Sequence, residues 1–243
     1  MTKSVSVLAS VLLFTCLSVS HAEIASVSVR VDGLACPFCV HGVEKKLEAV
    51  EGVGGVTVDL ADGRADLLLE GDVLPPPGQI GLAVKKAGFT ARSIDITAVG
   101  SITADGERLW LRVRFGPERF LLIPHASEGG SRLARLRDLA SGGTPVAVSG
   151  SVHQHADGPL GLVVTDVQEV HELVFRVRGL DCDKCAERLA IALGKVPGVY
   201  RAVINHAAAR ATVESLGTAV DAEAIRHAIV AAGFEVADDD GER

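Results

Sequence analysis

Hydrophobic and polar residues follow a regular order of periodicities near the beginning of the chain. Apolar residues alternate with polar ones over residues 27–31 and then recur at helical spacing over 40–50. Alternation returns on both sides of an Asp62-Gly63 turn, which is typical of a β-hairpin. A second helical pattern over 80–87 is followed by a last alternating segment at 94–96. The predicted order is strand, helix, strand, strand, helix, strand.

The same order of periodicities returns in the last third of the chain. A strand pattern over 173–177 precedes a helical pattern over 189–193, a hairpin pattern over 199–214 and a second helical pattern. Identical residues also recur at a constant spacing, since Cys182 lies 146 positions after Cys36. We interpret the two segments as copies of one domain, each with the split βαβ order of a ferredoxin-like sandwich.

The segment between the two copies follows a different pattern, in which strand signals predominate. Five alternating segments surround one helical pattern over 131–140, with Gly116-Pro117 as a predicted turn. The helix follows the third strand, an order that resembles an OB-type barrel. The predicted strands lie near Ile102 and at 109–115, 119–123, 145–152 and 160–167.

We therefore predict the fold class α+β, with two ferredoxin-like βαββαβ sandwiches flanking a small, OB-like β-barrel domain. The predicted boundaries are 1–22 for a signal peptide, 24–98 for the first sandwich, 99–170 for the barrel, 172–238 for the second sandwich and 239–243 for a charged tail. The repeated unit therefore makes up more than half of the chain.

The first 22 residues have the features of a secretory signal. Lys3 precedes a short apolar stretch over 5–19, and Ser20 and Ala22 are small residues at the positions that determine cleavage. We predict an exported protein, periplasmic or secreted, with no stable membrane span once the signal is removed. A lipoprotein anchor at Cys16 and a buried N-terminal strand are the alternatives, although the small residue that lipidation requires directly before the cysteine is missing.

Composition narrows the classes of function. The 243 residues are 48% hydrophobic and 23% charged, which describes a globular protein and not a disordered one. The net charge of −7 argues against general nucleic-acid binding, which needs a basic surface, and suits a protein that handles cations. The sequence contains no pattern typical of a Ser-His-Asp triad, a phosphate-binding loop or an ATPase phosphorylation site, so we predict no enzymatic activity.

Four of the five cysteines form two Cys-x-x-Cys motifs, Cys36 with Cys39 and Cys182 with Cys185. Each motif follows a predicted strand and opens a predicted helix, whose N-terminal amides and dipole favour the thiolate form. Two thiolates at this spacing can bind one ion and suit soft cations such as Cu(I) and Hg(II). Inert local disulfides and thiol–disulfide exchange are the alternative interpretations.

With these motifs in place, both copies resemble heavy-metal-associated domains. This is the fold of copper metallochaperones, mercury-scavenging periplasmic proteins and the metal-binding modules of P-type metal ATPases. The resemblance covers 24–98 and 172–238. The residues that match the family pattern are Gly33, Cys36, Cys39 and Gly88-Phe89 in the first copy and Gly179, Cys182, Cys185 and Gly233-Phe234 in the second.

The resemblance implies a function in metal trafficking or detoxification. Each cysteine pair is expected to capture a soft cation and release it by ligand exchange to a metal transporter or another cysteine-containing carrier. A thiol–disulfide redox protein that uses the same cysteines is one alternative. An adaptor whose barrel docks a metal transporter is the other.

The two copies depart from the family pattern beside the cysteines. Leu34 and Leu180 replace a methionine that is a core contact in the family, so metal binding is expected to survive. Asp181 directly precedes Cys182, as an acidic residue does in zinc- and cadmium-type pump modules. Its carboxylate could complete a site for Zn(II) or Cd(II), whereas Ala35 offers no such donor in the first copy. A helix-capping or solvated carboxylate is the alternative role for Asp181.

A third candidate metal site lies in the middle segment. His153 and His155, followed by Asp157, fall near the predicted turn that joins the last two strands of the barrel. Histidine and carboxylate at this spacing can ligate Zn(II) or Cu(II), and a solvated loop is the alternative. His41, two residues after Cys39, is expected to point away from the first cysteine pair.

Overall fold

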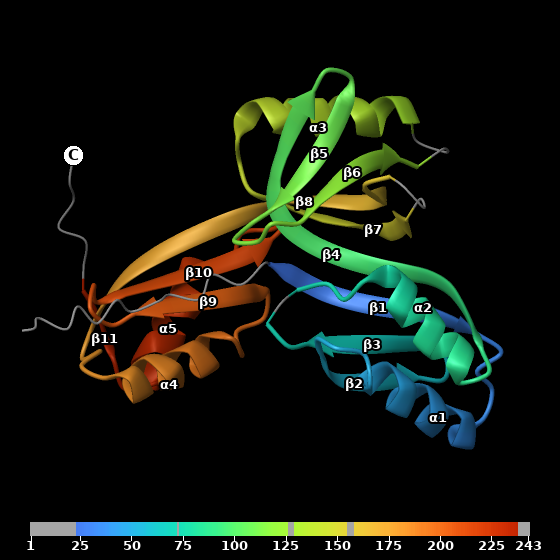
Figure 1. Ribbon diagram of the computed structural model, residues 1–243. Coiled ribbons are helices and arrows are strands. Elements are labelled where there is room, and N and C mark those ends of the chain that lie inside the picture. Colours follow the sequence, from blue (N-terminus) through green and yellow to red (C-terminus); the bar gives the residue numbers. More distant parts are fainter. Residues whose placement is uncertain (1–22, 72, 126–128, 155–157, 238–243) are drawn as a thin grey trace, which may run out of the picture.

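The computed structural model describes residues 23–71, 73–125, 129–154 and 158–237. The predicted signal segment with Cys16 and the charged tail lie outside the described residues. Within these ranges, two small sandwiches flank a barrel (Figure 1). Of the helices in these ranges, none is long and apolar enough to cross a membrane.

The first sandwich has the predicted order of strands and helices. Its elements are β1 (Ile24–Asp32), α1 (Pro37–Glu48), β2 (Val53–Asp59), β3 (Arg64–Leu69), α2 (Pro77–Lys86) and β4 (Thr90–Asp105). The strands pair in the antiparallel order β2-β3-β1-β4. Both helices pack on this sheet around a core that includes Val29, Leu47 and Ile80. Gly63 provides the positive φ of 59° that the β2–β3 turn needs.

The second sandwich repeats this arrangement. Its elements are β8 (Leu160–Arg178), α4 (Asp183–Leu193), β9 (Val199–Asn205), β10 (Arg210–Leu216), α5 (Ala222–Ala231) and β11 (Glu235–Ala237). β8 lies between β10 and β11, and β9 forms the edge beside β10. The helices bury Leu189, Leu193, Ile225 and Ile229 against the sheet.

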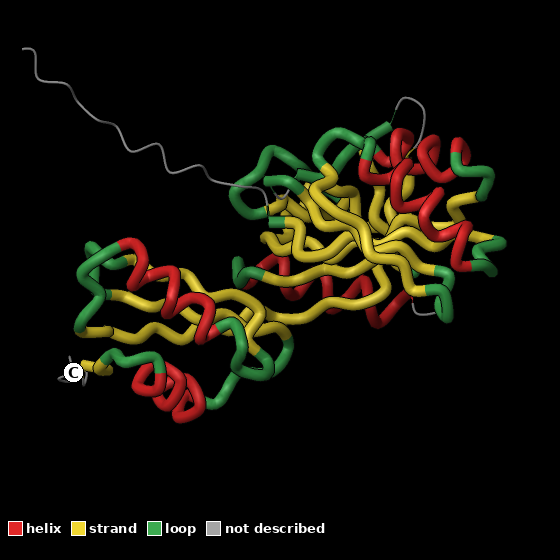
Figure 2. Tube along the Cα trace, turned by 90° about the horizontal axis from the view of Figure 1, so that it is seen from below, coloured by secondary structure: helices red, strands yellow, loops and turns green. Residues whose placement is uncertain are grey.

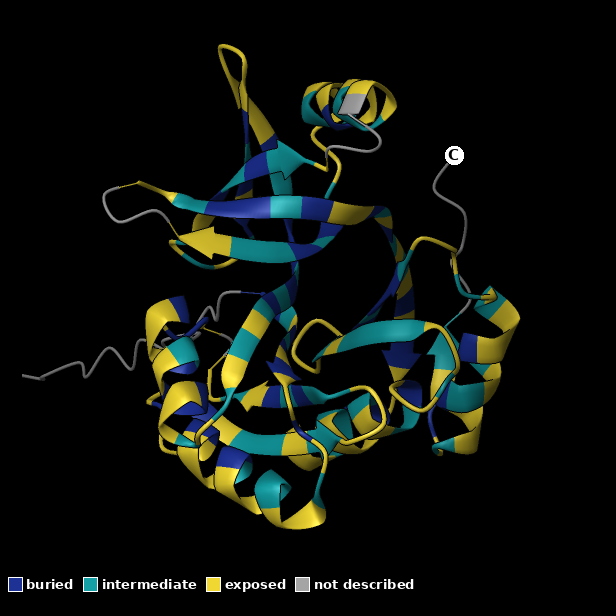
Figure 3. Ribbon diagram, turned by 90° about the vertical axis from the view of Figure 1, so that its right-hand side faces the viewer, coloured by how far each residue is buried: buried dark blue, intermediate teal, exposed yellow. Residues whose placement is uncertain are grey.

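A mixed barrel lies between the sandwiches. It adds β5 (Arg108–Val113), β6 (Arg119–Pro124), α3 (Gly129–Gly142) and β7 (Val146–Gln154) to β4 and β8. The described strands close in the order β4-β5-β6-β8-β7 and back to β4, with β6 and β8 parallel and the other pairs antiparallel. The interior holds Leu111, Phe120 and Leu162, and α3 adds Leu136. Figure 3 shows buried segments, in dark blue, along the strands of the barrel.

Two strands pass without a break through the expected boundaries at 98/99 and 170/172. β4 pairs with β1 in the first sandwich and then with β5 and β7 in the barrel. β8 pairs with β6 and β7 in the barrel and then with β10 and β11. The strand expected at the end of the first sandwich and the strand expected at the start of the barrel are therefore one strand, and the described strands form a single 11-stranded sheet (Figure 2).

A buried ion cluster joins the barrel to both sandwiches. The guanidinium of Arg114, in the turn after β5, donates to the two carboxylate oxygens of Glu214 at 2.9 and 2.6 Å. Its Nε donates to Oε2 of Glu23, which directly precedes β1, at 2.5 Å. Arg201 on β9 lies 3.2 Å from the same oxygen of Glu23. Both carboxylates are buried, and Tyr200 packs beside them in a small apolar cluster with Val99 and other residues.

Candidate metal centres

The first cysteine pair lies where β1 passes into α1. Gly33 takes a positive φ of 82°, which turns the chain out of the strand. Cys36 is the N-cap residue of α1, with an extended backbone, and its Sγ accepts a hydrogen bond from the backbone N–H of Cys39 at 3.2 Å. Pro37 occupies the first helical turn, where no N–H is needed. The cysteine therefore takes the position in which serine or aspartate usually caps a helix.

The second pair repeats this geometry after β8. Gly179 has a positive φ of 84°, and Cys182 is the N-cap of α4. The Sγ of Cys182 accepts from the backbone N–H of Cys185, again at 3.2 Å. Asp181 lies one residue before the N-cap, so the helix-capping role that we considered for it belongs to Cys182 instead. Its carboxylate is exposed next to the sulfur site.

The structure joins each pair as a disulfide. The Cα atoms of Cys36 and Cys39 are 5.3 Å apart, and those of Cys182 and Cys185 are 5.1 Å apart. Two electrons and two protons convert each disulfide to two thiols. The N-terminal amides and dipole of the helix then favour the thiolate, which is the form that binds metals. The reduced pairs can therefore present two sulfur donors to one ion.

The second residue of each pair also anchors the site to the core. Cys39 and Cys185 are half-buried against the hydrophobic cores of their sandwiches. Leu34 and Leu180, which stand at the position of the family methionine, are buried as core contacts, as expected. His41 is exposed on α1.

The surroundings of the two pairs differ in charge. In the first loop, Pro37 and Phe38 separate the cysteines, and Phe38 is 92% exposed. In the second loop, Asp183 and Lys184 separate them, and both are exposed. The residues between the cysteines are therefore apolar in the first loop and charged in the second.

The structure adds one residue to the second site that the sequence analysis missed. His206 follows β9, and its Nδ1 lies 3.3 Å from Oδ1 of Asp183, between the two cysteines. In a βαββαβ unit, the turn between the two central strands lies beside the strand-to-helix loop, because the strand after the turn pairs with the strand before the loop. A histidine in the turn between the two central strands could therefore have indicated from the sequence that His206 lies near the second cysteine pair.

The third candidate site is not assembled by the described residues. His153 is exposed at the end of β7, whereas His155 and Asp157 lie outside the described ranges. Among the residues that the structure describes, no group of three or more His, Cys, Asp and Glu side chains could hold a metal ion. A site with His153 and His155 stays a prediction.

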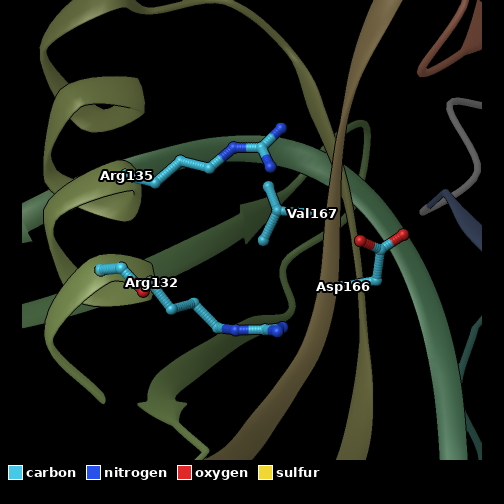
Figure 4. Close-up of a pocket in the computed structure, with 5 residues that line it drawn as sticks. Arg132, Arg135, Asp166 and Val167 are labelled. Carbon is cyan, nitrogen blue, oxygen red and sulfur yellow. The ribbon is translucent and has the colours of Figure 1, made fainter. Parts of the chain in front are cut away.

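A hollow of about 190 Å³ lies between α3 and β8 (Figure 4). Arg132 and Arg135 reach from α3 toward β8, and Arg132 donates to the backbone carbonyls of Val164 and Thr165. The described lining contains no cysteine or histidine. This hollow therefore lacks the soft donors of the two cysteine loops.

Comparison with known proteins identifies the repeated unit. The family model described as "Heavy-metal-associated domain" matches residues 28–90 and 174–235. These matches cover 125 of the 243 residues and fall on the two sandwiches. The barrel between them lies outside the matches.

Two relatives are ATPases. The chain is 26% identical over 223 residues to "Copper-transporting ATPase 1" of Rhizobium meliloti, a match that covers 92% of this chain and 17% of the relative. It is 41% identical over 56 residues to "Cation-transporting P-type ATPase B" of Mycobacterium bovis, covering 23% of this chain and 7% of the relative. The chain thus spans less than a fifth of the length of these relatives.

A solved structure, "Solution structure of the N-terminal soluble domains of Bacillus subtilis CopA", is 16% identical to this chain. The match covers 88% of this chain and 93% of that one, with a TM-score of 0.28. The conclusion about identity therefore rests on the family match and on the two cysteine loops that it contains. The chain belongs to the heavy-metal-associated domain family, of which it carries two copies.

Proposed function

We propose that this protein captures soft metal cations, Cu(I) foremost, at its two cysteine pairs and passes them to a partner that carries cysteines. One observation carries the proposal: in both copies an exposed or half-exposed cysteine pair caps a helix, with the first sulfur accepting the backbone N–H of the second cysteine. The similarity to a relative that is named as a copper-transporting ATPase adds support.

The chemistry of capture and release follows from the position of the sulfurs. Two thiolates bind a soft cation and leave further coordination positions open on the solvent side of the loop. A thiolate of the partner can enter there before a sulfur of this chain leaves, so the ion need not be released into water. The metal transporter or metal carrier that we expected as partner fits this exchange.

The two sites are proposed to differ in the ions that they accept. The first loop offers sulfur alone, which suits Cu(I) or Hg(II). Around Cys182, the exposed carboxylate of Asp181 supplies an oxygen donor, which suits Zn(II) or Cd(II). Asp181→Asn is expected to weaken Zn(II) binding at the second site and to leave Cu(I) binding unchanged. An unchanged Zn(II) affinity would contradict the assignment of Asp181 as a metal ligand.

Export and the OB-like assignment of the barrel also belong to the proposal. The sequence of residues 1–22 supports cleavage after Ala22 and release into the periplasm or medium. The strand order of the barrel, with a helix after its third strand, supports the OB-like assignment. Mass spectrometry of the exported protein tests the first point, because cleavage after Ala22 leaves Glu23 as the first residue.

Native mass spectrometry of the reduced protein tests metal binding. The chain is titrated with Cu(I), Hg(II) and Zn(II), beside variants in which both cysteines of one pair are replaced by serine. We expect two bound ions, with one lost for each pair that is removed. Ala35→Ser is the matched control, because it adds a hydroxyl to the first loop and removes no sulfur. No bound ion under reducing conditions contradicts the proposal.

The disulfides favour a second candidate function, thiol–disulfide exchange. Both pairs are joined in the structure, and a disulfide at a helix N-terminus is also the arrangement of redox proteins. Reduction of a disulfide substrate by the reduced chain, lost when Cys36 and Cys182 are replaced by serine, would support this function. Metal binding without such exchange would leave the metal carrier as the sole function of the pairs.

A further inference from the structure

The strand register places the two cysteine loops in opposite directions from the barrel. β7 pairs with both strands that leave the barrel, so it serves as a common reference. Val146, at its beginning, pairs with Gly100 of β4 and Glu169 of β8. From Gly100 toward lower residue numbers, β4 runs alongside β7 toward the C-terminal end of β7 and continues into the first sandwich. From Glu169 toward higher residue numbers, β8 passes beyond the N-terminal end of β7 and continues into the second sandwich.

The end of each strand that lies farthest from the barrel is beside a cysteine loop. Thr90, at the start of β4, pairs with Asp32, the last residue before the first loop. Arg178, at the end of β8, directly precedes the second loop. From Gly100 back to Thr90 and from Glu169 on to Arg178 the path is about 60 Å along the strands, at roughly 3.3 Å per residue.

Curvature of the strands shortens the direct distance but does not bring the loops together. Figure 1 shows β4 and β8 diverging from the barrel, with α1 and α4 in the outer parts of the two sandwiches. Sulfurs that share one ion must lie within about 5 Å of each other, because each metal–sulfur bond is about 2.3 Å long. The two pairs are therefore held far outside the range of a shared ion.

The arrangement is held by more than two strands. Arg114 connects Glu214 of the second sandwich to Glu23 at the start of the first, and both carboxylates are buried. Val170, in the part of β8 that links barrel and second sandwich, is also buried, against Val99 of β4. A hinge would need this stretch of strand to lose its pairing and this ion cluster to break.

We infer that the two metal sites work independently and that no ion passes between them within one molecule. The inference rests on the proposed function and specifies how the sites are used. The two loops also differ in the residues that they expose. Phe38 is exposed in the first loop, and Asp181, Asp183 and Lys184 are exposed in the second.

Cadmium binding tests the inference, because Cd(II) readily takes four sulfur ligands. If the two pairs could approach each other, Cd(II) would bind to all four cysteines more tightly than to one pair. The reduced chain and the two variants Cys36→Ser/Cys39→Ser and Cys182→Ser/Cys185→Ser are titrated with Cd(II) at low protein concentration. We expect each remaining pair to keep the affinity that it has in the intact chain within about twofold. At high concentration we expect cadmium-bridged dimers, since pairs on different molecules can meet.

A monomer that holds one Cd(II) through all four cysteines overturns the inference. In that case either double variant weakens Cd(II) binding by 100-fold or more. Failure of the proposed function looks different, because then the intact chain binds neither Cd(II) nor Cu(I). Cys36 and Cys182 cap their helices at the surface, whereas Cys39 and Cys185 are half-buried, and serine is close to cysteine in size. The serine variants are therefore expected to fold, and far-UV circular dichroism checks this.

Discussion

Arg114 is a cation held between buried carboxylates. Its side chain is 19% exposed and pairs with Glu214 through two hydrogen bonds and with Glu23 through a third. Arg114→Met leaves two buried negative charges without their shared partner, which costs about 3–5 kcal/mol for a buried pair. We expect a loss of this size in the free energy of unfolding, measured by urea denaturation with far-UV circular dichroism.

An exposed pair provides the matched control for Arg114→Met. Arg92 lies 2.9 Å from Asp32, with both side chains largely in solvent. Arg92→Met is expected to cost less than about 1 kcal/mol, because water and salt screen a surface pair. Equal losses in the two variants would contradict the importance of the buried cluster.

Tyr200 packs beside the same cluster. Its signal can be assigned without ambiguity, because it is the only tyrosine of the chain. Burial, and then the negative charge of Glu23, raise the pKa of its hydroxyl above the usual value of about 10. The folded protein therefore holds the phenol proton more tightly than the unfolded chain does. The resulting stabilisation is complete below about pH 10 and is lost as the pH rises toward the raised pKa.

Alkaline titration checks this expectation for Tyr200. We expect the ultraviolet absorbance of the phenolate to appear only together with unfolding, and Tyr200→Phe to reduce the loss of stability above pH 10. In denaturant the same tyrosine should titrate near its usual pKa. A phenolate that forms near pH 10 while the circular dichroism is unchanged would show that Tyr200 is not protected.

At this scale, the sequence was sufficient for residues that form a motif and insufficient for residues that meet only in the fold. Cys36 and Cys182 could be identified because each begins a repeated Cys-x-x-Cys motif after a strand signal. Arg114 lies 91 residues from Glu23 and 100 residues from Glu214 in sequence. Their contact depends on the relative placement of three units, which no local pattern encodes.

At the scale of elements, Gly100 allows β4 and β5 to approach closely. A Cβ at this position would lie 2.0 Å from the carbonyl oxygen of Arg112. Gly100→Ala therefore forces two paired strands apart, and we expect a loss of about 1–3 kcal/mol or more in the free energy of unfolding. Denaturation followed by the fluorescence of Trp110, the only tryptophan and a residue of β5, measures this loss.

A glycine with open space around it provides the control for Gly100→Ala. Gly42 lies in α1, and a Cβ there would meet no atom within 4 Å. Gly42→Ala is expected to stabilise the protein by about 0.5–1 kcal/mol, because alanine favours the helix. A neutral effect of Gly100→Ala would mean that the two strands can separate at no cost.

Most elements could be predicted from the sequence, but their continuity could not. Alternation identified the strands and helical spacing identified the helices, including one expected over 131–140 and found as α3. Alternation shows that a segment is extended and says nothing about which sheet it joins. β4 changes its partner from β1 to β5 without ending as a strand, so the two strands expected there are one.

The sheet that runs through the barrel and both sandwiches makes the distance between the metal loops a fixed property of the fold. β4 and β8 carry the two sandwiches away from the barrel on different sides, and the Arg114 cluster holds them there (Figure 1). A protein of this kind is expected to bind metal without closing. Domains joined by a flexible linker would behave differently, because a shared ion could draw them together.

Small-angle X-ray scattering can distinguish these two kinds of behaviour. We expect the radius of gyration and the maximum dimension of the reduced chain to stay unchanged when both cysteine pairs are loaded with Cu(I). Arg114→Met is the informative comparison, because breaking the ion cluster should widen the distribution of distances in the metal-free chain. Compaction of the intact chain on loading would contradict a rigid arrangement, since it requires movement of the sandwiches about β4 or β8.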